Sequence, residues 1–310
     1  MQTIGLLAAI IMLFYFLGRA ADIVVAQVRL LGRQWGIDLA FLGFLLGFFT
    51  SFPELSITIN AALTGGQDIA LGNLLGGIPV LIGLVLGLNV VMHRKISTRV
   101  TQRPILAIAF TMLLPFALAA DGQIGPIDGF VLVGAYVSIL IALFLQGRHK
   151  RLPRLKLFVK TDIGRPVLYV ILASIAVALL ANFIIRFTET LLLSWSVPAF
   201  WVGLLLFSIG TNLPEIIISF HARKRAEEEL SVSNIVGSAM ANVIILGLGA
   251  MIIPFGVPEG VGFGVLALTT ALIMTMLVAT YRSGGRFTRA EGFALIFGYI
   301  VFVVGQVLVL

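Results

Sequence analysis

Long hydrophobic stretches alternate with short polar breaks that contain Pro and Gly along almost the whole chain. A helix needs about 20 mostly apolar residues to cross the hydrocarbon core of a bilayer. The pattern predicts ten membrane-spanning helices, at residues 2–18, 39–63, 69–92, 104–120, 127–146, 166–187, 197–221, 230–253, 260–281 and 290–310. The fold class that we expect is therefore an all-α, polytopic membrane protein.

The basic residues support this segmentation, because cytoplasmic loops of membrane proteins are enriched in Lys and Arg. Of the 21 Lys and Arg residues, all except Arg186 follow an odd-numbered span. We therefore expect these loops on the cytoplasmic side of the plasma (inner) membrane and both chain termini outside. Residues 1–18 lack the basic start of a cleaved signal peptide, so we expect them to form the first span.

Composition agrees with a membrane protein. Hydrophobic residues make up 59% of the 310 residues and charged residues 11%, where a soluble domain has about 25% charged residues. The net charge of +7 is explained by basic loops that face anionic lipid, so we expect no nucleic-acid partner. The chain has no cysteine, which excludes disulfides, thiolate metal ligands and cysteine nucleophiles.

A basic segment, residues 148–165, divides the chain into two halves, residues 1–147 and 166–310. Each half contains five predicted spans. Because five is an odd number, two homologous halves must cross the membrane in opposite directions, and such inverted repeats are common among secondary transporters. The pattern therefore predicts ten transmembrane helices in two inverted five-helix repeats, joined by a cytoplasmic linker.

The two halves share a motif at an offset of 161 residues. The segment FTSFPE ends at Glu54 and the segment GTNLPE ends at Glu215, and the same register continues without a gap through the next span. This internal similarity places the two repeats at about residues 41–92 and 202–253. The matches fall on residue types that are rare inside a membrane.

Glu54 and Glu215 are the only carboxylates predicted far from the end of a span. An ionised carboxylate in hydrocarbon is costly, so carboxylates at this depth usually face a polar cavity and mark an ion or proton pathway. A protonated Glu bonded to a neighbouring helix is the alternative for either residue alone. A matched pair favours the ion pathway.

Other polar residues surround this pair in the sequence. Pro53 and Pro214 each remove a backbone donor and free a carbonyl one turn earlier, and free carbonyls and carboxylates are ligands that suit Ca²⁺ and Na⁺. Polar side chains that could share this site are Thr50, Thr211, Asn73, Asn234, Ser238 and Asn242. Helix packing through polar side chains remains an alternative for Asn242, and helix packing through small residues is expected for Gly72, Gly76, Gly83 and Gly87.

These motifs resemble the cation/calcium exchanger superfamily, which includes the sodium/calcium exchangers. That family carries two inverted repeats, each with a G-T-S-L-P-E-type segment followed by a G-N-x-x-G-S-N-x-x-[ND]-type segment. The corresponding second segments here read GNLLGGIPVL and SNIVGSAMAN. The resemblance implies that Glu54 and Glu215 are cation ligands, with hydroxyl or carbonyl oxygens from Thr50, Ser51, Thr211 and Ser238.

The first repeat departs from the family pattern. Gly77 stands where the family has Ser, and Leu81 stands where Asn or Asp would bind. In the second repeat Asn212 replaces a Ser, and we expect Asn212 to belong to the site as well. Because Leu cannot coordinate a cation, one ion site of the usual set is expected to be missing or rebuilt. Asn242 lies at a position that is often Asp.

The sequence therefore predicts an antiporter that exchanges Ca²⁺, or another cation, for H⁺ or Na⁺ by alternating access, with nearly electroneutral exchange and H⁺ the preferred partner. It is not expected to be an enzyme, because no nucleophile-base arrangement is evident. The alternatives are a degenerate family member without exchange activity and an ion channel. We expect no covalently bound cofactor, and the partners are inorganic cations and the lipid bilayer. The oligomeric state is left open.

Overall fold

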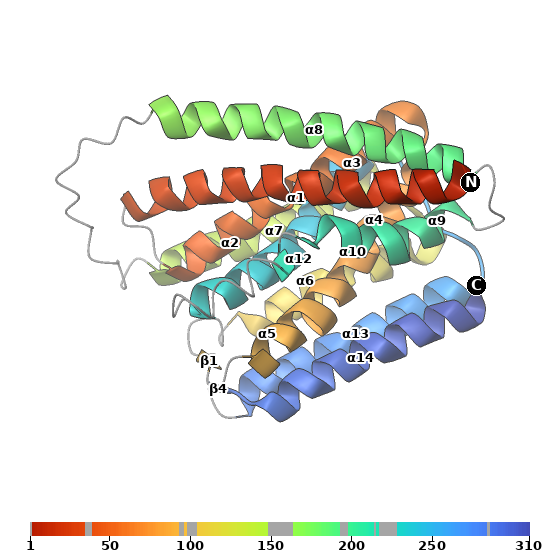
Figure 1. Cartoon of the computed structure of the whole chain (residues 1–310). Helices are drawn as coiled ribbons and strands as arrows, with labels where there is room; N and C mark the ends of the chain where they lie inside the picture. Colours follow the sequence, from red (N-terminus) through yellow and green to blue (C-terminus); the bar gives the residue numbers. More distant parts are fainter. Residues whose placement is uncertain are drawn as a thin grey trace.

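The described part of the chain is almost entirely helical, as the sequence predicts. The computed structural model describes residues 2–34, 39–92, 96–97, 104–147, 164–192, 198–213, 215–216, 228–283 and 286–310. Most of the long helices run along roughly the same axis (Figure 1).

The helices of the first half, in chain order, are α1 (Gln2–Gln34), α2 (Leu39–Thr50), α3 (Phe52–Thr64), α4 (Gln67–Pro79), the π-helix η1 (Val80–Leu86), α5 (Gly87–Met92), α6 (Ile105–Leu118), the 3₁₀-helix η2 (Ala119–Asp121) and α7 (Pro126–Gly147). Those of the second half are α8 (Gly164–Leu192), α9 (Ala199–Val202), the π-helix η3 (Gly203–Phe207), α10 (Ser208–Thr211), α12 (Glu228–Ile252), α13 (Val261–Arg282) and α14 (Arg289–Val309).

Seven helical segments of the described residues are long and apolar enough to cross a membrane. They lie at Gly5–Val24, Gln67–Met92, Pro126–Leu145, Gly164–Thr188, Ser231–Ile252, Val261–Arg282 and Arg289–Val309. The other three predicted spans also coincide with helix, in shorter pieces: α2 with α3, α6 with η2, and α9 through η3 to α10. The end of the seventh predicted span lies outside the described residues.

The first helix is longer than predicted. The predicted span ends at residue 18, whereas α1 continues to Gln34 and its most apolar segment reaches Val24. The hydrophobic pattern stops at Arg19, but backbone hydrogen bonding continues past this charge because no proline interrupts the helix. Arg19 and Asp22 therefore lie within a helix and not in a loop.

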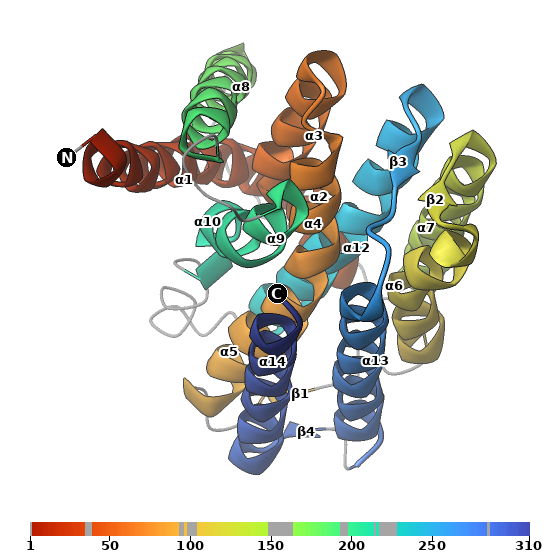
Figure 2. The same ribbon diagram turned by 90° about the vertical axis from the view of Figure 1, so that its right-hand side faces the viewer.

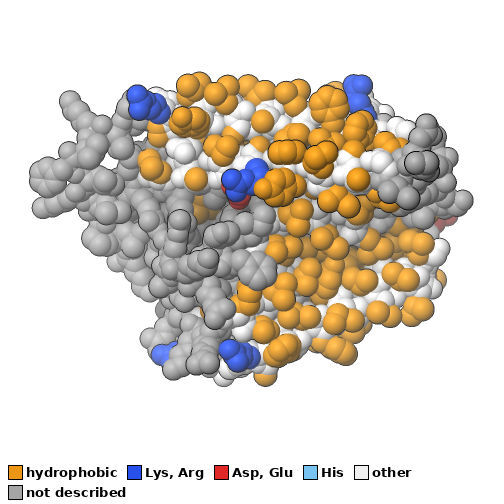
Figure 3. All heavy atoms as spheres, viewed as in Figure 1, with side chains coloured by type: hydrophobic (Ala, Val, Ile, Leu, Met, Phe, Trp, Pro, Cys, Tyr) orange, Lys and Arg blue, Asp and Glu red, His pale blue; other side chains and the backbone are white. Residues whose placement is uncertain are grey.

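Two segments form the centre of the molecule. The window Gln67–Met92 is 83% buried and the window Ser231–Ile252 is 78% buried, whereas Gly164–Thr188 is only 25% buried. The central helices thus contact protein on most sides, while outer helices such as α8 expose large apolar side chains. Figure 3 shows that hydrophobic side chains cover most of the described surface on one face. Such a surface suits contact with lipid and supports an integral membrane protein.

Local sequence explains several helix ends. Gly65 adopts the left-handed conformation (φ 87°) and its N–H bonds to the Ala61 carbonyl, which ends α3. Thr288 and Glu291 form a reciprocal capping box that begins α14. Pro79 ends α4, and the chain continues as the π-helix η1. Because a proline lacks the N–H that a helix needs, a change of hydrogen-bonding pattern near Pro79 is expected.

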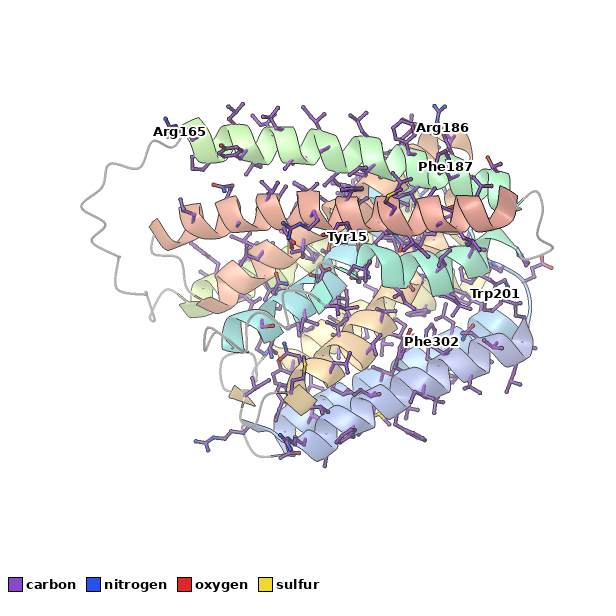
Figure 4. All side chains as sticks on the ribbon, viewed as in Figure 1. Tyr15, Arg165, Arg186, Phe187, Trp201 and Phe302 are labelled. Atoms are coloured by element: carbon purple, nitrogen blue, oxygen red, sulfur yellow. The ribbon has the colours of Figure 1, made fainter. Side chains whose placement is uncertain are left out.

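Helices of one half pack against helices of the other. In the centre, α12 packs on α2 and α7, while α4 packs on η3 and α9, and α5 and η1 pack on α14. The helix α1 packs along α8. Figures 1 and 4 show that these two helices run in opposite directions: α1 begins at the N-terminus, at the end of the bundle where α8 carries Arg186, and Arg165 lies at the other end of α8.

The helix contacts follow the 161-residue offset. Adding 161 to the bounds of α1, α2, α4 to α5, α6 to η2, and α7 gives, within a few residues, the bounds of α8, α9 to α10, α12, α13 and α14. The contacts correspond when each helix is replaced by its equivalent in the other half. The contact of α12 with α2 then corresponds to that of α4 with η3 and α9. The contact of α12 with α7 corresponds to that of α5 and η1 with α14.

Four two-residue strands, which the sequence did not predict, obey the same relation. They are β1 (Ile96–Ser97), β2 (Gln123–Ile124), β3 (Phe255–Gly256) and β4 (Arg286–Phe287). β1 pairs with β4 and β2 pairs with β3, both antiparallel. When each strand is replaced by its equivalent in the other half, the pair of β1 and β4 becomes the pair of β3 and β2. Figure 2 shows β2 and β3 beside α7 and β1 and β4 beside α13.

Close helix packing at the paired glycines is confirmed. A Cβ atom added at Gly72 or Gly76 would lie 2.1 Å or 2.5 Å from a backbone oxygen of the α9–η3 segment. A Cβ at Gly83 or Gly87 would meet Tyr299 or Ile296 of α14 at 2.8 Å. These glycines let neighbouring helices approach closely, as small residues do in membrane proteins.

Candidate cation site

Each of the two motifs places a helix break beside its carboxylate. In the first half, α2 ends at Thr50, Ser51 leaves the helical conformation (φ −83°, ψ 16°), and α3 begins with Pro53 and Glu54 in its first turn. Proline fits this position because the first turn of a helix does not need its N–H. The break puts Glu54 at the start of a new helix, deep in the molecule.

The second half repeats this geometry. The helix α10 ends at Thr211, and Asn212 has φ −89° and ψ 10°. The Ile216 N–H bonds to the Asn212 carbonyl at 3.2 Å, as the equivalent Leu55 N–H bonds to the Ser51 carbonyl at 3.0 Å. Pro214 lies outside the described residues, so its predicted effect on this helix stays a prediction.

A backbone carbonyl gathers several donors at the first break. The Gly47 oxygen accepts from the Ser51 N–H at 3.2 Å, the Thr50 hydroxyl at 2.9 Å and the Ser51 hydroxyl at 3.0 Å. The Ser238 hydroxyl of α12 lies 3.3 Å from the same oxygen. A Cβ at Gly47 would lie 2.4 Å from the backbone of residues 237 and 238, so glycine is required for this close approach.

Glu215 is held by two hydroxyl groups. The Ser238 hydroxyl donates to Glu215 Oε1 at 3.1 Å, and the Thr50 and Ser238 hydroxyl oxygens lie 2.8 Å apart. All three side chains are buried. Since a hydroxyl has one proton, Thr50 can donate either to the Gly47 carbonyl or to Ser238, and when it donates to Ser238 the Ser238 proton is free for Glu215. This chain joins α2, α12 and the segment after α10.

The Glu54 carboxylate has fewer hydrogen bonds than the Glu215 carboxylate. It is fully buried, and neither of its carboxylate oxygens has a hydrogen-bond partner of normal geometry among the described residues. Thr211 lies near it, but the Thr211 hydroxyl is directed at Asn73 Oδ1 (3.1 Å) and the Phe207 carbonyl (3.0 Å). Glu54 lies close enough to Glu215 for their charges to affect each other.

Four buried amide side chains line the same region. Asn73 accepts from Thr211, and Asn212 donates to the Ser208 carbonyl at 2.7 Å. Among the described residues, no hydrogen-bond partner exists for Asn73 Nδ2, Asn212 Oδ1 or either amide atom of Asn234 and Asn242. Leaving a buried polar atom unpaired costs about 1–3 kcal/mol. A group of such atoms beside two carboxylates is therefore more typical of a binding site than of a packed core.

All ten residues predicted for the site are buried: Glu54, Glu215, Thr50, Ser51, Thr211, Asn212, Ser238, Asn242, Asn73 and Asn234. Direct contacts link Thr50, Ser238 and Glu215 in one group and Asn73 and Thr211 in another. Ser51 contacts the Gly47 carbonyl. Leu81 is also fully buried, in η1, and as an alkyl side chain offers no ligand.

Sequence reasoning missed one carboxylate near this site. Asp22 of α1 lies close enough to Glu215 for their charges to interact. It also lines a shallow groove between α1 and α8, beside Phe16, Arg19 and Leu180. Asp22 and Arg19 form an ion pair of 3.9 Å. The first helix continues past the predicted span, but Asp22 lies only two residues before the end of its apolar segment, Gly5–Val24, and is therefore near a span end.

The arrangement defines a class of protein. Two buried carboxylates, contributed by matched helix breaks and surrounded by hydroxyl, amide and carbonyl oxygens, lie inside a helical membrane protein. Two ionised carboxylates cannot remain buried side by side without compensation, since each costs several kcal/mol. They therefore need positive charge from bound cations or protons. A buried site that binds cations inside a membrane protein is typical of a cation transporter.

Comparison with known proteins identifies the family. The model of the family described as "Sodium/calcium exchanger protein" matches residues 5–145 and 165–308. The chain belongs to this family of membrane exchangers, and the resemblance noted from the two motifs is confirmed.

The relatives are distant, and their similarity covers from three quarters to nearly all of the chain. The chain is 27% identical to the inner membrane protein YrbG of Escherichia coli over 76% of each chain. It is 21% identical to the sodium/calcium exchanger MaX1 of Methanosarcina acetivorans over 93% of this chain and 95% of that protein. Among solved structures, the sodium-calcium exchanger NCX_Mj has a similar fold, with a TM-score of 0.72, 21% identity and coverage of 98% of both chains.

Proposed function

We propose that this protein is a secondary active antiporter that exchanges Ca²⁺, or another cation, for H⁺ or Na⁺ by alternating access. The observation that carries this proposal is the pair Glu54 and Glu215, buried together at matched helix breaks of the two halves. Two carboxylates supply a charge of −2, which balances one divalent ion, two monovalent ions or two protons. Because the charge of −2 must be compensated while it is buried, the site stays occupied by one of these sets of cations or exchanges it for another.

The ligands that we propose are hard oxygens, which Ca²⁺ and Na⁺ prefer. Besides the carboxylates, the proposed set comprises Thr50, Ser51, Thr211, Asn212, Ser238, Asn242, Asn73 and Asn234. The Gly47 carbonyl, on which three hydroxyl groups converge, is added to this set on structural grounds. The unpartnered oxygens of Glu54 support a role as the ligand that is most free to turn toward a cation.

We propose that residues 1–147 and 166–310 are two inverted repeats and that residues 148–165 are a cytoplasmic linker. The 161-residue offset between helix bounds, the exchange of helix contacts and strand pairs, and the opposite directions of α1 and α8 all support this relation (Figures 1 and 4). A site between two such repeats becomes accessible from either side when the packing of one half changes against the other.

For the membrane, we propose the plasma (inner) membrane, with both termini outside. The termini lie at the same end of the bundle (Figure 1), and Arg165 lies at the opposite end (Figure 4). Because the chain contains no cysteine, single cysteines added at either terminus can be tested with a membrane-impermeant thiol reagent on intact cells. Labelling of both without permeabilisation supports this orientation.

The test of the function is Ca²⁺ flux into liposomes that contain the purified protein. We expect uptake only when an outward Na⁺ or H⁺ gradient is present, imposed separately. An ion channel would carry Ca²⁺ down its own gradient without a counter-ion, and a degenerate family member would show no flux under either gradient. Either result contradicts the proposal.

A further inference from the structure

An open groove runs along the outer pair of helices, between α1 and α8. It has a volume of about 650 Å³ and is lined on α1 by residues between Phe16 and Gln27 and on α8 by Ala176, Leu179 and Leu180. Both helices lie at the edge of the bundle (Figures 1 and 2). In a membrane, a groove at this edge faces lipid.

Two charged side chains, Arg19 and Asp22, line this mostly apolar groove. Arg19 Nη1 lies 3.9 Å from Asp22 Oδ2, and the two side chains are 65% and 25% exposed. An exposed ion pair of this length contributes little to stability. A guanidinium has five N–H donors, and this contact engages only one of its nitrogens. The Arg19 guanidinium can therefore bind a further anionic group.

The groove extends from the end of the apolar segment of α1 into its interior. Within Gly5–Val24, Asp22 lies two residues before the end, Arg19 five and Phe16 eight. At 1.5 Å per residue these are distances along the helix of about 3, 7.5 and 12 Å. A long Arg side chain near the end of a span extends toward the lipid headgroups. The charged pair thus lies within reach of the headgroups, and Phe16 lies at the depth of the acyl chains.

The packing of α1 on α8 does not depend on these charges. At the offset of 161 residues, Arg19 corresponds to Leu180 and Asp22 to Phe183, and both of these are apolar. Below the groove, Ala20 and Val177 are buried together in an apolar contact. Apolar side chains therefore hold the two helices together, and the charges in the groove need another explanation.

We propose that this groove binds one phospholipid whose headgroup carries a phosphate and a primary ammonium, as phosphatidylethanolamine does. The Arg19 guanidinium donates to the phosphate, and the Asp22 carboxylate accepts from the ammonium. One acyl chain lies along the groove toward Phe16, against Leu179 and Leu180.

The two charges select this headgroup over others. An ethylene group joins the phosphate to the ammonium, so opposite charges lie close together in the lipid as they do on α1. A choline headgroup has no N–H to donate to Asp22, and a glycerol headgroup offers no positive charge to it. Phosphatidylcholine and phosphatidylglycerol are therefore expected to bind through Arg19 alone and more weakly.

The experiment measures binding of added lipid to the purified full-length protein in detergent. The Tm is followed as phosphatidylethanolamine, phosphatidylcholine or phosphatidylglycerol is added, because a ligand that binds the folded state raises the Tm with its concentration. Phosphatidylethanolamine is expected to raise the Tm at a lower concentration than the other two. Equal concentration dependence for all three lipids would overturn the proposal.

Substitutions assign the binding to the two charges. Arg19→Gln is expected to weaken binding of phosphatidylethanolamine about tenfold, as the loss of a hydrogen bond to a charged group does, whereas Arg19→Lys keeps most of it because Lys also binds phosphate. Asp22→Asn is expected to remove the preference over phosphatidylcholine. The matched control is Arg186→Gln, an exposed Arg at the other end of α8 (Figure 4). Equal losses in Arg19→Gln and Arg186→Gln would contradict the site.

A further variant tests the groove and leaves both charges in place. Ala176→Leu narrows the groove from the α8 side, so phosphatidylethanolamine is expected to bind more weakly although Arg19 and Asp22 are unchanged. Unchanged binding in this variant would show that no acyl chain lies in the groove. None of these measurements involves transport, so their outcome is independent of whether the protein exchanges cations.

Discussion

Asn182 of the outer helix α8 donates a hydrogen bond of 2.6 Å to the side-chain oxygen of Asn60 on α3. Asn60 in turn donates to the Ser56 carbonyl of its own helix at 2.8 Å. Because α3 begins beside Glu54, this bond connects the helix that carries a site carboxylate to the pair of outer helices, α1 and α8. Both side chains are partly buried.

The first prediction is that Asn60 and Asn182 stabilise the protein as a pair. Asn60→Ala and Asn182→Ala should each lower the free energy of unfolding, and the double variant should lose less than the sum, with a coupling energy of about 0.6–1.7 kcal/mol. The measurement is unfolding in detergent monitored by circular dichroism. Strict additivity of the two losses would show that the bond does not form.

The second prediction concerns the carboxylates. Glu54→Gln and Glu215→Gln should each abolish divalent exchange, because one remaining carboxylate leaves one charge of a Ca²⁺ ion uncompensated in a buried site. Asn242→Ala should weaken exchange less, since no charge is lost. The measurement is Ca²⁺ uptake into liposomes with an outward Na⁺ or H⁺ gradient.

The control for this pair is Glu259→Gln, a carboxylate that lies exposed between α12 and α13. It should exchange Ca²⁺ like the unchanged protein. Uptake near the unchanged rate in either site variant would exclude the proposed role of that carboxylate.

The carboxylate pair could be predicted from the sequence because burial of charge is expensive. Acidic side chains are rare in hydrophobic stretches, so Glu54 and Glu215 stand out with no structural information. The helix break in the first half could be predicted for a similar reason, since Pro53 cannot donate to the helix. The 161-residue offset then related the two halves and, with them, most helix bounds.

Other features depend on distances between helices, which a hydrophobic pattern does not contain. The position of Asn242 over Gly77 follows from how closely α12 approaches α4. The sequence shows only that Asn242 is polar and that Gly77 is small. Asp22 was missed because a charged residue ends a hydrophobic stretch without ending a helix. The strand pairs are two residues long, too short for any alternating pattern to be recognised.

The third prediction concerns Asp22. Its negative charge interacts with that of Glu215 and adds to the attraction of a cation toward the site. Asp22→Asn removes this charge and leaves Arg19 without its ion-pair partner, so the apparent Ca²⁺ affinity should fall about two- to threefold at low ionic strength. The effect should shrink as salt is added, since Asp22 is partly exposed. The measurement is the Ca²⁺ dependence of initial uptake rates.

Asp121→Asn is the matched control for Asp22, because Asp121 is exposed in η2 and bonds only to the nearby Gln123 N–H in the described structure. The same charge is removed from the protein as a whole. Equal effects of the two substitutions would mean that net charge, and not proximity to Glu215, changes the affinity.

The last prediction concerns the coupling ion. Gly77 and Leu81 provide no oxygen in the first half, where Ser238 and Asn242 stand in the second. Monovalent metal ions beyond the two that Glu54 and Glu215 neutralise therefore have fewer ligands, whereas a proton binds a carboxylate without a shell of ligands. We predict nearly electroneutral exchange, with two H⁺ or two Na⁺ for each divalent ion and H⁺ as the preferred partner.

The measurement is Ca²⁺ flux into liposomes whose membrane potential is set by K⁺ and valinomycin. Flux driven by a pH gradient should hardly change with the potential, because no net charge crosses in a cycle. Exchange that depends strongly on the potential, requires Na⁺ and ignores the pH gradient would show that other groups replace the missing ligands.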